Sequence, residues 1–473
     1  MIYRLSQARQ YNFTTLSALY CFTDRVLCQF YKHAKMLTAH LVWLIGMPMK
    51  TIIFATFIIV ITLSLKGQAT PFNMGERITI QSTVLSQTRE LQVLLPESYY
   101  SDPQASYPVI YLMDGDYNFH GVAGMLDFLA GKGELIPDVI LVGIADKGTV
   151  QYRQFMTPSS FAAKSPKTKG KAAEFLSFIT EEVQAKITQN YRIADHSTLV
   201  GQSMGGLFVL NALLEQPDAF NNYVAISPSV WLAEQAIVAK AKEKLLNAEH
   251  QPVSLFLSLA DETRMGQYDF INVLDLNQPG AINWQFKHYP DESHNSVGII
   301  ALRDSLKVLF KGWYIAENQL DSFATAESLV KHYQELMTRL KFSQPIPSTS
   351  IRQLVRKFYR EKQVDKLPSF IEYASQKLPA SKQALIEMQA RYVGHFESPK
   401  AALPLLLEVE AEFSQSIDYT KAIASTYEQL ADKAMENYSQ QKKDAGLLDY
   451  TDMLVLADKL LKQPEVLNHI KKR

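Results

Sequence analysis

The feature that most constrains this chain is a Gly-x-Ser-x-Gly pattern at residues 201–205, read as GQSMG. A short β-branched stretch precedes it at 197–200, and an apolar helical run follows at 207–214. Strand, tight turn and helix in this order are the context of a nucleophile elbow, whose serine sits on a strained turn with its hydroxyl exposed. The alternative is a serine that caps a helix in a glycine-rich turn. The context favours Ser203 as a nucleophile.

Apolar strand-like runs alternate with helical stretches through the first two thirds of the chain. The expected strands are two within 77–95, then 107–113, 139–144, 199–200, 223–226, 253–259 and 284–289. Such alternation is typical of βαβ units and a mostly parallel sheet covered by helices on both faces. We therefore expect an α/β fold, with its chemistry at the carboxyl ends of the strands.

After about residue 314 the strand-like runs disappear and apolar residues keep a helical spacing. We predict an α/β domain over 70–314, a connecting helix and linker over 315–350, and an all-helical domain over 351–473. The expected helices are 351–361, 366–377, 381–396, 399–413, 419–438 and 451–461. Degenerate tetratricopeptide-like pairs fit this pattern, although no repeat signature identifies them.

The N-terminal region resembles an export signal with an extension before it. Met49 and Lys50 precede an apolar run at 51–65, and a small-x-small ending predicts cleavage after Ala69. We interpret 1–69 as an N-terminal extension and signal peptide, with translation starting at Met49 and the mature protein periplasmic or extracellular. The alternative joins 37–65 into an uncleaved membrane anchor. Both cysteines, Cys21 and Cys28, precede the predicted cleavage, so the mature protein would need no disulfide.

Charge narrows the possible functions. The 473 residues carry 48 Lys and Arg against 48 Asp and Glu, for a formal net charge of +0. A nucleic-acid-binding protein would usually show a basic excess, so we expect no nucleic-acid partner.

A serine hydroxyl needs a base to remove its proton, and in this fold class the partners follow in the order serine, acid, histidine. His294 lies in a loop after the strand expected at 284–289 and before a helix at 297–310, where it can point at the elbow. His288 lies within that strand, and His250 lies on a polar connection. We interpret His294 as the base, with a solvated loop histidine as the alternative.

The acid should follow the strand at 253–259, where Asp261 and Glu262 stand side by side. Adjacent residues point in different directions, so at most one can hold the histidine, and the residues alone favour neither.

The oxyanion hole needs two backbone amides. We expect one from Met204 and one from Asp116, because Gly115 lets the chain turn inward after its strand; the alternative there is an ordinary Asp-Gly turn.

Four motifs in order resemble the putative-esterase family of α/β-hydrolases: YLMDGDYNF at 111–119, GQSMGGLF at 201–208, SPSVW at 227–231 and SHNS at 293–296. The family includes enterochelin (ferric siderophore) esterases, esterase D-type enzymes, some feruloyl esterases and mycobacterial mycolyltransferases. The resemblance covers about 75–312 and excludes the C-terminal helices. It implies Ser203 as nucleophile, His294 as base and Glu262 as the acid. The arginine-bearing loop of relatives is partly present at 153–158, without its usual aspartate.

These observations predict a serine hydrolase of carboxylic esters, and siderophore-type esters fit the resemblance. Arg153 would bind an acidic substrate, and Trp231 would line its pocket, with a buried core tryptophan as the alternative. Lys164, Lys167, Lys169 and Lys171 are further candidates, or a solvated face. We expect neither a metal ion nor a cofactor. The alternatives are an acyltransferase with the same site and a silent scaffold that binds a protein partner through the C-terminal helices.

Overall fold

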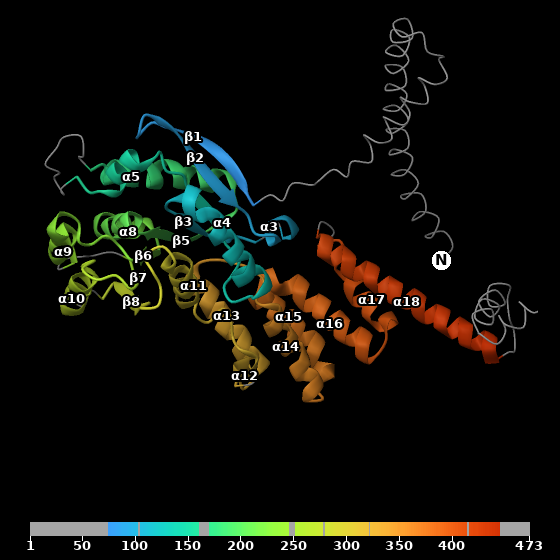
Figure 1. Cartoon of the computed structure of the whole chain (residues 1–473). Helices are drawn as coiled ribbons and strands as arrows, with labels where there is room; N and C mark the ends of the chain where they lie inside the picture. Colours follow the sequence, from blue (N-terminus) through green and yellow to red (C-terminus); the bar gives the residue numbers. More distant parts are fainter. Residues whose placement is uncertain are drawn as a thin grey trace, which may run out of the picture. The chain divides into compact units, whose positions relative to one another are not determined.

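The computed structural model describes residues 74–102, 105–159, 170–245, 251–277, 280–320, 322–413 and 416–444 (Figure 1). The predicted signal peptide, its start at Met49, the two cysteines, His250 and the helix expected at 451–461 lie outside these residues. By its contacts, Met74–Arg473 forms one compact unit.

Within the described residues, one sheet of eight strands runs in the order β1-β2-β4-β3-β5-β6-β7-β8. Strand β2 is antiparallel to both of its neighbours, and the strands from β4 to β8 are mutually parallel. The predicted mostly parallel sheet is confirmed. Its strands are β1 Glu76–Ser82, β2 Gln87–Leu94, β3 Tyr107–Leu112, β4 Ile140–Ile144, β5 Ile193–Gln202, β6 Asn222–Ile226, β7 Val253–Leu259 and β8 Ile282–His288.

The central strands are continuous apolar runs because both of their faces are covered. Every residue of β3 is buried, whereas β1 at the edge buries only some of its residues. In the register between β3 and β5, Leu112 pairs with Val200. The loop after β3 and the turn after β5 therefore leave the sheet at the same edge.

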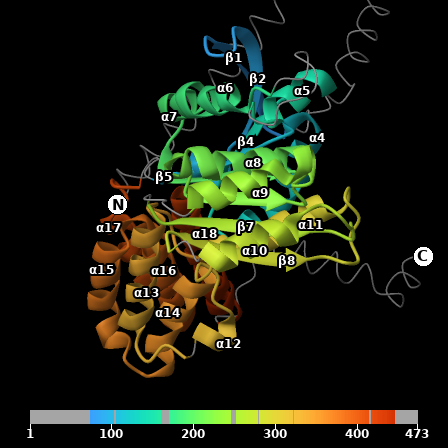
Figure 2. The same cartoon turned by 90° about the vertical axis from the view of Figure 1, so that its left-hand side faces the viewer.

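Helices cover both faces of the sheet, as predicted. On one face a buried core joins the sheet to α5 (Thr149–Met156), α6 (Ala172–Ser177), η3 (Phe178–Val183), α7 (Gln184–Asn190), α8 (Met204–Glu215), α9 (Leu232–Lys244) and α10 (Gln267–Asn277). On the other face a second core joins it to α4 (Gly115–Leu126), η1 (Asp127–Lys132) and α11 (Val297–Leu309). Figure 2 shows α8 and α9 lying side by side.

The C-terminal region is helical, as predicted. Its elements are α12 Glu317–Leu320, α13 Ala326–Leu340, α14 Ser348–Arg360, η6 Val364–Lys366, α15 Leu367–Lys377, η7 Pro379–Ser381, α16 Lys382–Phe396, α17 Pro399–Glu408 and α18 Ile417–Asp444. Two short elements complete the hydrolase part: α3 Ser98–Ser101 and η4 Pro217–Ala219. None of the helices in the described ranges is long and apolar enough to cross a membrane.

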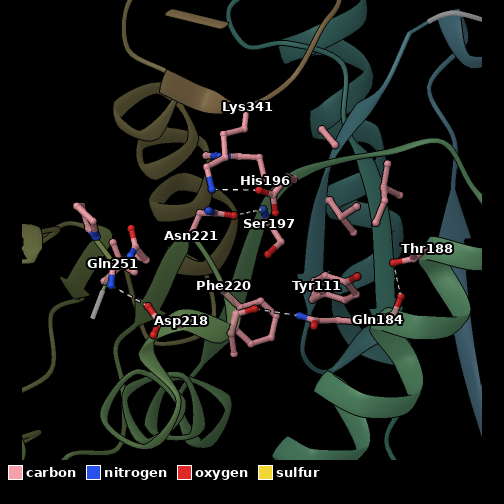
Figure 3. Close-up of a pocket in the computed structure, with 17 residues that line it drawn as sticks. Tyr111, Gln184, Thr188, His196, Ser197, Asp218, Phe220, Asn221, Gln251 and Lys341 are labelled. Atoms are coloured by element: carbon pink, nitrogen blue, oxygen red, sulfur yellow. Dashed lines mark hydrogen bonds and ion pairs between the residues drawn. The ribbon is translucent and has the colours of Figure 1, made fainter. Parts of the chain in front are cut away.

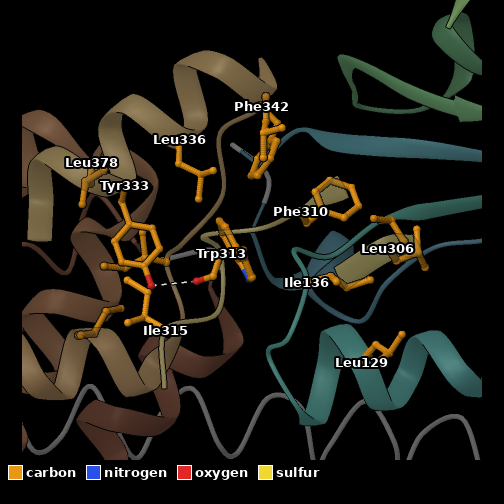
Figure 4. Close-up of a cluster of buried hydrophobic side chains, with 14 of the residues drawn as sticks. Leu129, Ile136, Leu306, Phe310, Trp313, Ile315, Tyr333, Leu336, Phe342 and Leu378 are labelled. Atoms are coloured by element: carbon orange, nitrogen blue, oxygen red, sulfur yellow. Dashed lines mark hydrogen bonds between the residues drawn. The ribbon is translucent and has the colours of Figure 1, made fainter. Parts of the chain in front are cut away.

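The second core continues from α11 into the C-terminal helices without a break (Figure 4). Trp313 is 4% exposed and packs against Phe342 and Tyr333, with ring centroids 5.5 and 6.1 Å apart. The Tyr333 hydroxyl donates to the Trp313 carbonyl at 2.9 Å and pairs with Ser350 Oγ at 2.7 Å. The division of this unit at residues 314 and 350 stays a prediction, and residues on both sides of it share one core.

The segment after α13 attaches to the amino ends of the sheet strands. The Ser106 amide, just before β3, donates to the Ser343 carbonyl at 3.2 Å. The Gln344 amide group donates to the Asp138 carbonyl, before β4, at 2.7 Å. Lys341 forms an ion pair with Asp195 at the start of β5, at 3.0 Å. These contacts lie at the opposite end of the strands from the edge where chemistry was expected.

Candidate active site

Ser203 lies on a strained turn between β5 and α8. Its φ of 58° and ψ of −116° are a conformation that non-glycine residues rarely adopt. The Ser203 amide donates to the Ile226 carbonyl at 2.9 Å, which ties the turn to β6. A Cβ at Gly201 would lie 2.4 Å from the Gly205 carbonyl carbon, so the turn closes only with glycine at that position. The sequence pattern has the local geometry of a nucleophile elbow.

Ser229 is the hydrogen-bond partner of the Ser203 hydroxyl in this structure, with their Oγ atoms 3.4 Å apart. The Ser229 amide also donates to the Ser203 carbonyl at 3.0 Å. Ser229 is 2% exposed, so it supports the elbow from inside the loop after β6. Its place in the SPSVW motif marks that loop, but a motif alone does not say which serine faces the elbow.

Glu262, rather than Asp261, contacts His294. Its Oε1 hydrogen-bonds His294 Nδ1, while its Oε2 accepts from the Ala260 amide at 3.0 Å and from Ser227 Oγ at 3.2 Å. The Asp261 side chain is exposed, and its amide donates to the Glu292 carbonyl at 2.9 Å. The structure therefore distinguishes the two acidic residues, between which the residues alone gave no preference and the family resemblance implied Glu262.

Gln202 brings the loop of His294 to the elbow. Its side-chain amide donates to the His294 backbone carbonyl. A Cβ at Gly298 would lie 2.5 Å from Gln202 Oε1, so the start of α11 also packs tightly on this side chain. The residue directly before Ser203 thus holds the loop that carries the imidazole, with Nδ1 directed at Glu262. Sequence reasoning missed this role because glutamine in the motif reads as a variable position.

The two expected oxyanion-hole amides lie in the first turns of two helices. Met204 begins α8 after β5, and Asp116 is the second residue of α4 after β3. First-turn amides have no acceptor within their own helix, so both remain available to a ligand. The Asp116 carboxylate pairs with Arg77 Nη2 on β1 at 3.1 Å. Gly115 is buried and opens α4, so this Asp-Gly pair is part of a helix start.

The two candidate substrate-binding residues are both accessible. Trp231 is 47% exposed and directly follows the buried Val230. Arg153 is exposed on α5. In the part of the chain that the structure describes, neither side chain hydrogen-bonds Ser203, His294 or Glu262. Lys171 is exposed before α6, while Lys164, Lys167 and Lys169 lie outside the described residues.

Sequence reasoning also missed a carboxyl–phenol pair behind the elbow. The Tyr152 hydroxyl donates to Asp114 Oδ2 at 3.1 Å. Burial raises the pKa of Asp114 to about 7, with the charge of Asp146 adding to the effect, and burial likewise raises the pKa of Tyr152. Asp114 has a left-handed φ of 57° at the start of α4. The signal for this pair is spatial, because 38 residues separate its members.

A separate cavity of about 330 Å³ lies at the amino ends of β5, β6 and β7 (Figure 3). Its polar groups already interact with other residues of this chain. Asp195 pairs with Lys341, Asp218 accepts from the Gln251 amide at 2.8 Å, and His196 Nε2 lies 2.9 Å from Asn222 Nδ2. Burial lowers the pKa of His196 to about 4, so this imidazole is neutral. The cavity contains none of the candidate catalytic residues.

No cluster of three or more His, Cys, Asp or Glu that could hold a metal ion occurs among the described residues. The candidate active site consists of the elbow, the acid–histidine pair and the two helix starts.

Sequence comparison matches this part of the chain to known esterases. Residues 82–266 match the family described as putative esterase. The chain is 29% identical to the ferri-bacillibactin esterase BesA of Bacillus subtilis over 240 residues, which are 45% of this chain and 82% of that protein. It is 37% identical to a siderophore enterobactin esterase of Emericella nidulans over 86 residues, which are 18% of this chain and 28% of that protein.

Structural comparison extends the likeness beyond the sheet. An IroE-like serine hydrolase from Shewanella oneidensis has a TM-score of 0.52 at 26% identity and covers 67% of this chain and 99% of its own. An uncharacterised protein from Capnocytophaga ochracea shares the fold with a TM-score of 0.52 at 15% identity, covering 74% of this chain and 99% of its own. Both shares exceed what residues 70–314 can supply, so the shared fold includes part of the helical region. Residues 82–266 thus match the putative-esterase family within an α/β-hydrolase fold, and the chain is a serine-type carboxylic ester hydrolase.

Proposed function

We propose that Ser203, His294 and Glu262 are the nucleophile, base and acid of this esterase, and that its substrates are siderophore-type esters. The observation that carries the proposal is the bond between His294 Nδ1 and Glu262, on a loop that Gln202 fastens to the elbow. With Nδ1 held by a carboxylate, Nε2 is the nitrogen that can accept a proton from Ser203.

In the first step, Ser203 Oγ attacks the ester carbonyl carbon while His294 Nε2 takes the hydroxyl proton. The imidazolium that forms is stabilised by the Glu262 carboxylate. The carbonyl oxygen becomes an oxyanion, which accepts hydrogen bonds from the amides of Met204 and Asp116. In this structure the Ser203 hydroxyl is bonded to Ser229, so the bond to His294 forms when the substrate is bound, as is common for catalytic hydrogen bonds.

The oxyanion intermediate then collapses and the bond to the alcohol oxygen breaks. His294 gives its proton to the departing alcohol, which leaves an acyl group on Ser203. A water molecule then attacks the acyl group with His294 as base, which releases the carboxylic acid and restores the free serine. Every proton that leaves a nucleophile returns to a leaving group, so water is the only reagent that the cycle needs besides the ester.

Two lines of support favour siderophore-type esters among possible substrates. BesA is named for ferri-bacillibactin, and the Emericella nidulans relative for enterobactin. In this chain, an exposed indole at Trp231 and an exposed guanidinium at Arg153 offer an aromatic face and a positive charge. Aromatic, anionic ester groups would interact favourably with both.

Labelling with a fluorophosphonate probe tests the nucleophile. We expect the wild-type chain to be labelled once, at Ser203, and Ser203→Ala to be unlabelled and inactive. Ser229→Ala is the matched control, because it removes a neighbouring hydroxyl that plays no part in the proposed bond making. A folded wild-type protein that stays unlabelled, or an active Ser203→Ala variant, contradicts the proposal.

A panel of esters tests the substrate class. We expect kcat/KM to be highest for a macrocyclic catecholate trilactone, against p-nitrophenyl acetate and a feruloyl ester as references. Equal rates on all three would reject the siderophore assignment and leave the esterase activity intact. Transfer of the acyl group to an added alcohol in preference to water would instead indicate an acyltransferase.

We propose also that the protein is exported. The support is the basic start, the apolar run at 51–65 and the small-x-small ending at Ala69. N-terminal sequencing of the protein from its natural host should begin at Thr70. A mature protein that begins at Met1 or Met49 contradicts cleavage.

A further inference from the structure

Asp114 and Tyr152 lie directly behind the elbow, at the junction of three elements. Asp114 follows β3 and begins α4, since its carbonyl accepts the amides of Tyr117 and Asn118 at 3.0 and 2.9 Å. Tyr152 comes from α5 and donates its hydroxyl to Asp114 Oδ2 at 3.1 Å. The pair thus joins the start of α4 to a helix on the opposite face of the sheet.

The same pair touches the start of α8. A Cβ added at Gly205 would lie 3.1 Å from Asp114 Oδ2 and 3.8 Å from the Tyr152 hydroxyl, and the Gly205 backbone amide interacts with that hydroxyl. Gly205 directly follows Met204, whose amide is one of the two oxyanion-hole donors proposed above. The other proposed donor, Asp116, is two residues from Asp114. The carboxyl–phenol pair therefore includes the first residue of the α4 start and contacts the α8 start, the two segments that carry the proposed donors.

Resting on the proposed function, we propose that Asp114 and Tyr152 are positioning residues that set the distance between the Met204 and Asp116 amides. An oxyanion hole works only when its donors lie 2.7–3.1 Å from the developing charge, so a small shift of either helix start weakens it. Asp114 fixes the start of α4, and the contact of the pair with Gly205 fixes the start of α8 against it. Neither side chain needs to touch the substrate for this role.

Burying the Asp114 carboxyl costs free energy of folding, and this cost supports a functional reason for having an aspartate at this position. A polar group removed from water is destabilising unless hydrogen bonds compensate, and among the described residues the Asp114 side chain accepts a hydrogen bond from the phenol of Tyr152. An apolar residue at 114 would avoid that cost but would lose the link to Tyr152. The left-handed backbone at Asp114 adds a strain that a glycine would relieve.

The charge of Asp114 should also influence the reaction. The groups around it are Tyr152 from α5 and Asp146 after β4, and Arg89 from β2 and Lys147 line the same small hollow. A proton on Asp114 keeps negative charge away from the oxyanion, whereas its ionised form opposes that charge. We therefore expect kcat to fall at alkaline pH as Asp114 ionises.

The test uses the near-isosteric variant Tyr152→Phe and the variant Asp114→Asn, with Tyr191→Phe as a matched control. Tyr191 also donates its hydroxyl to a carboxylate, Glu76 Oε1 at 2.8 Å, but Tyr191 itself lies before the amino end of β5. On p-nitrophenyl acetate, we expect kcat to fall about tenfold or more in Tyr152→Phe, with KM within about twofold, because a shifted donor weakens transition-state binding only. Asp114→Asn should lack the alkaline fall in kcat.

Three outcomes would overturn the inference: wild-type kcat in Tyr152→Phe, an alkaline fall that persists in Asp114→Asn, or a loss confined to KM for bulky esters, which indicates substrate contact. The proposed function is judged separately by Ser203→Ala, which must be inactive whatever these variants do. Thermal unfolding of each variant shows whether it is folded at the assay temperature, and Tyr152→Phe keeps the test valid if Asp114→Asn does not fold.

Discussion

The Glu262 carboxylate is held on both of its oxygens. The Ala260 amide and the Ser227 hydroxyl bond Oε2, and His294 bonds Oε1. A carboxylate fixed in this way can orient the imidazole and stabilise its charged form without moving. Ser227 itself is completely buried and also accepts the Ala260 amide at 2.9 Å, so it belongs to the scaffold of the acid.

Glu262→Gln should lower kcat by a factor of about 10²–10⁴, because an amide at this position no longer stabilises the imidazolium. KM should change little. Asp261→Asn is the matched control, since its side chain is exposed and we expect wild-type kinetics from it. Steady-state kinetics on one ester test this prediction. A larger loss of kcat in the Asp261 variant would mean that Asp261, and not Glu262, is the acid.

The backbone of Ser203 predicts a conflict between stability and activity. Its φ of 58° costs on the order of 1–3 kcal/mol in a residue with a Cβ, and glycine avoids most of that cost. Ser203→Gly should therefore be inactive yet more stable than Ser203→Ala by about 1 kcal/mol in denaturant unfolding. An alanine variant at least as stable as the glycine variant would show that the turn is unstrained.

At the scale of elements, the site depends on how closely α8 approaches β5. A Cβ at Gly201 would meet the Gly205 backbone at 2.4 Å, and one at Gly206 would meet Pro228 Cα at 3.0 Å. The helix start cannot move away without displacing the Met204 amide. The glycines of the motif are therefore needed for packing as well as for the turn.

Gly201→Ala should lower the free energy of unfolding by about 1–3 kcal/mol and reduce labelling of Ser203, because the added methyl group forces backbone apart. Gly124→Ala is its control: this α4 position has nothing within 4 Å of an added Cβ, and alanine there should stabilise by about 0.5–1 kcal/mol. Chemical denaturation measures both. Equal effects at the two positions would contradict the packing argument.

The sequence predicted elements well where apolar residues alternate or run together, and less well where polar residues occupy a strand. The strand expected at 199–200 extends over Ile193–Gln202. Its amino half was not predicted because Asp195, His196 and Ser197 interrupt the apolar pattern there. Within the site, Ser203 and His294 follow from local context. Ser229, Gln202 and the Asp114–Tyr152 pair do not, because their partners come from distant segments. Glu262 and Asp261 are both carboxylates, and only the structure shows that the first points to His294 and the second to solvent.

At the scale of the molecule, the buried Asp114 makes stability depend on pH. The pKa of about 7 in the folded chain lies above the ordinary aspartate value of 3.8, so between these values the unfolded chain loses a proton that the folded one keeps. The free energy of unfolding should therefore fall as pH rises through this window, by at most about 1.4 kcal/mol per pH unit, and become constant above it. Denaturant unfolding at pH 5 and pH 7.5 should show this loss in the wild type and not in Asp114→Asn.

The shared core predicts that the sheet and the C-terminal helices unfold together. Trp313→Ala removes a ring that packs against both α13 and the residues beyond it, and should cost about 3–5 kcal/mol. Below its unfolding temperature the variant should keep wild-type kcat, because Trp313 lies away from the carboxyl ends of the strands. Calorimetry should show one transition in both proteins; two resolved transitions would indicate independent domains.

Because one buried core continues across residue 314, a single proteolytic cut there should destabilise the whole enzyme. A protease that cut the chain between α11 and α13 would expose Phe310, Trp313 and Tyr333 together and leave no half with a complete interior of its own. Nicked molecules should then be cleared whole instead of persisting as a trimmed hydrolase, and turnover of this protein should be all or none.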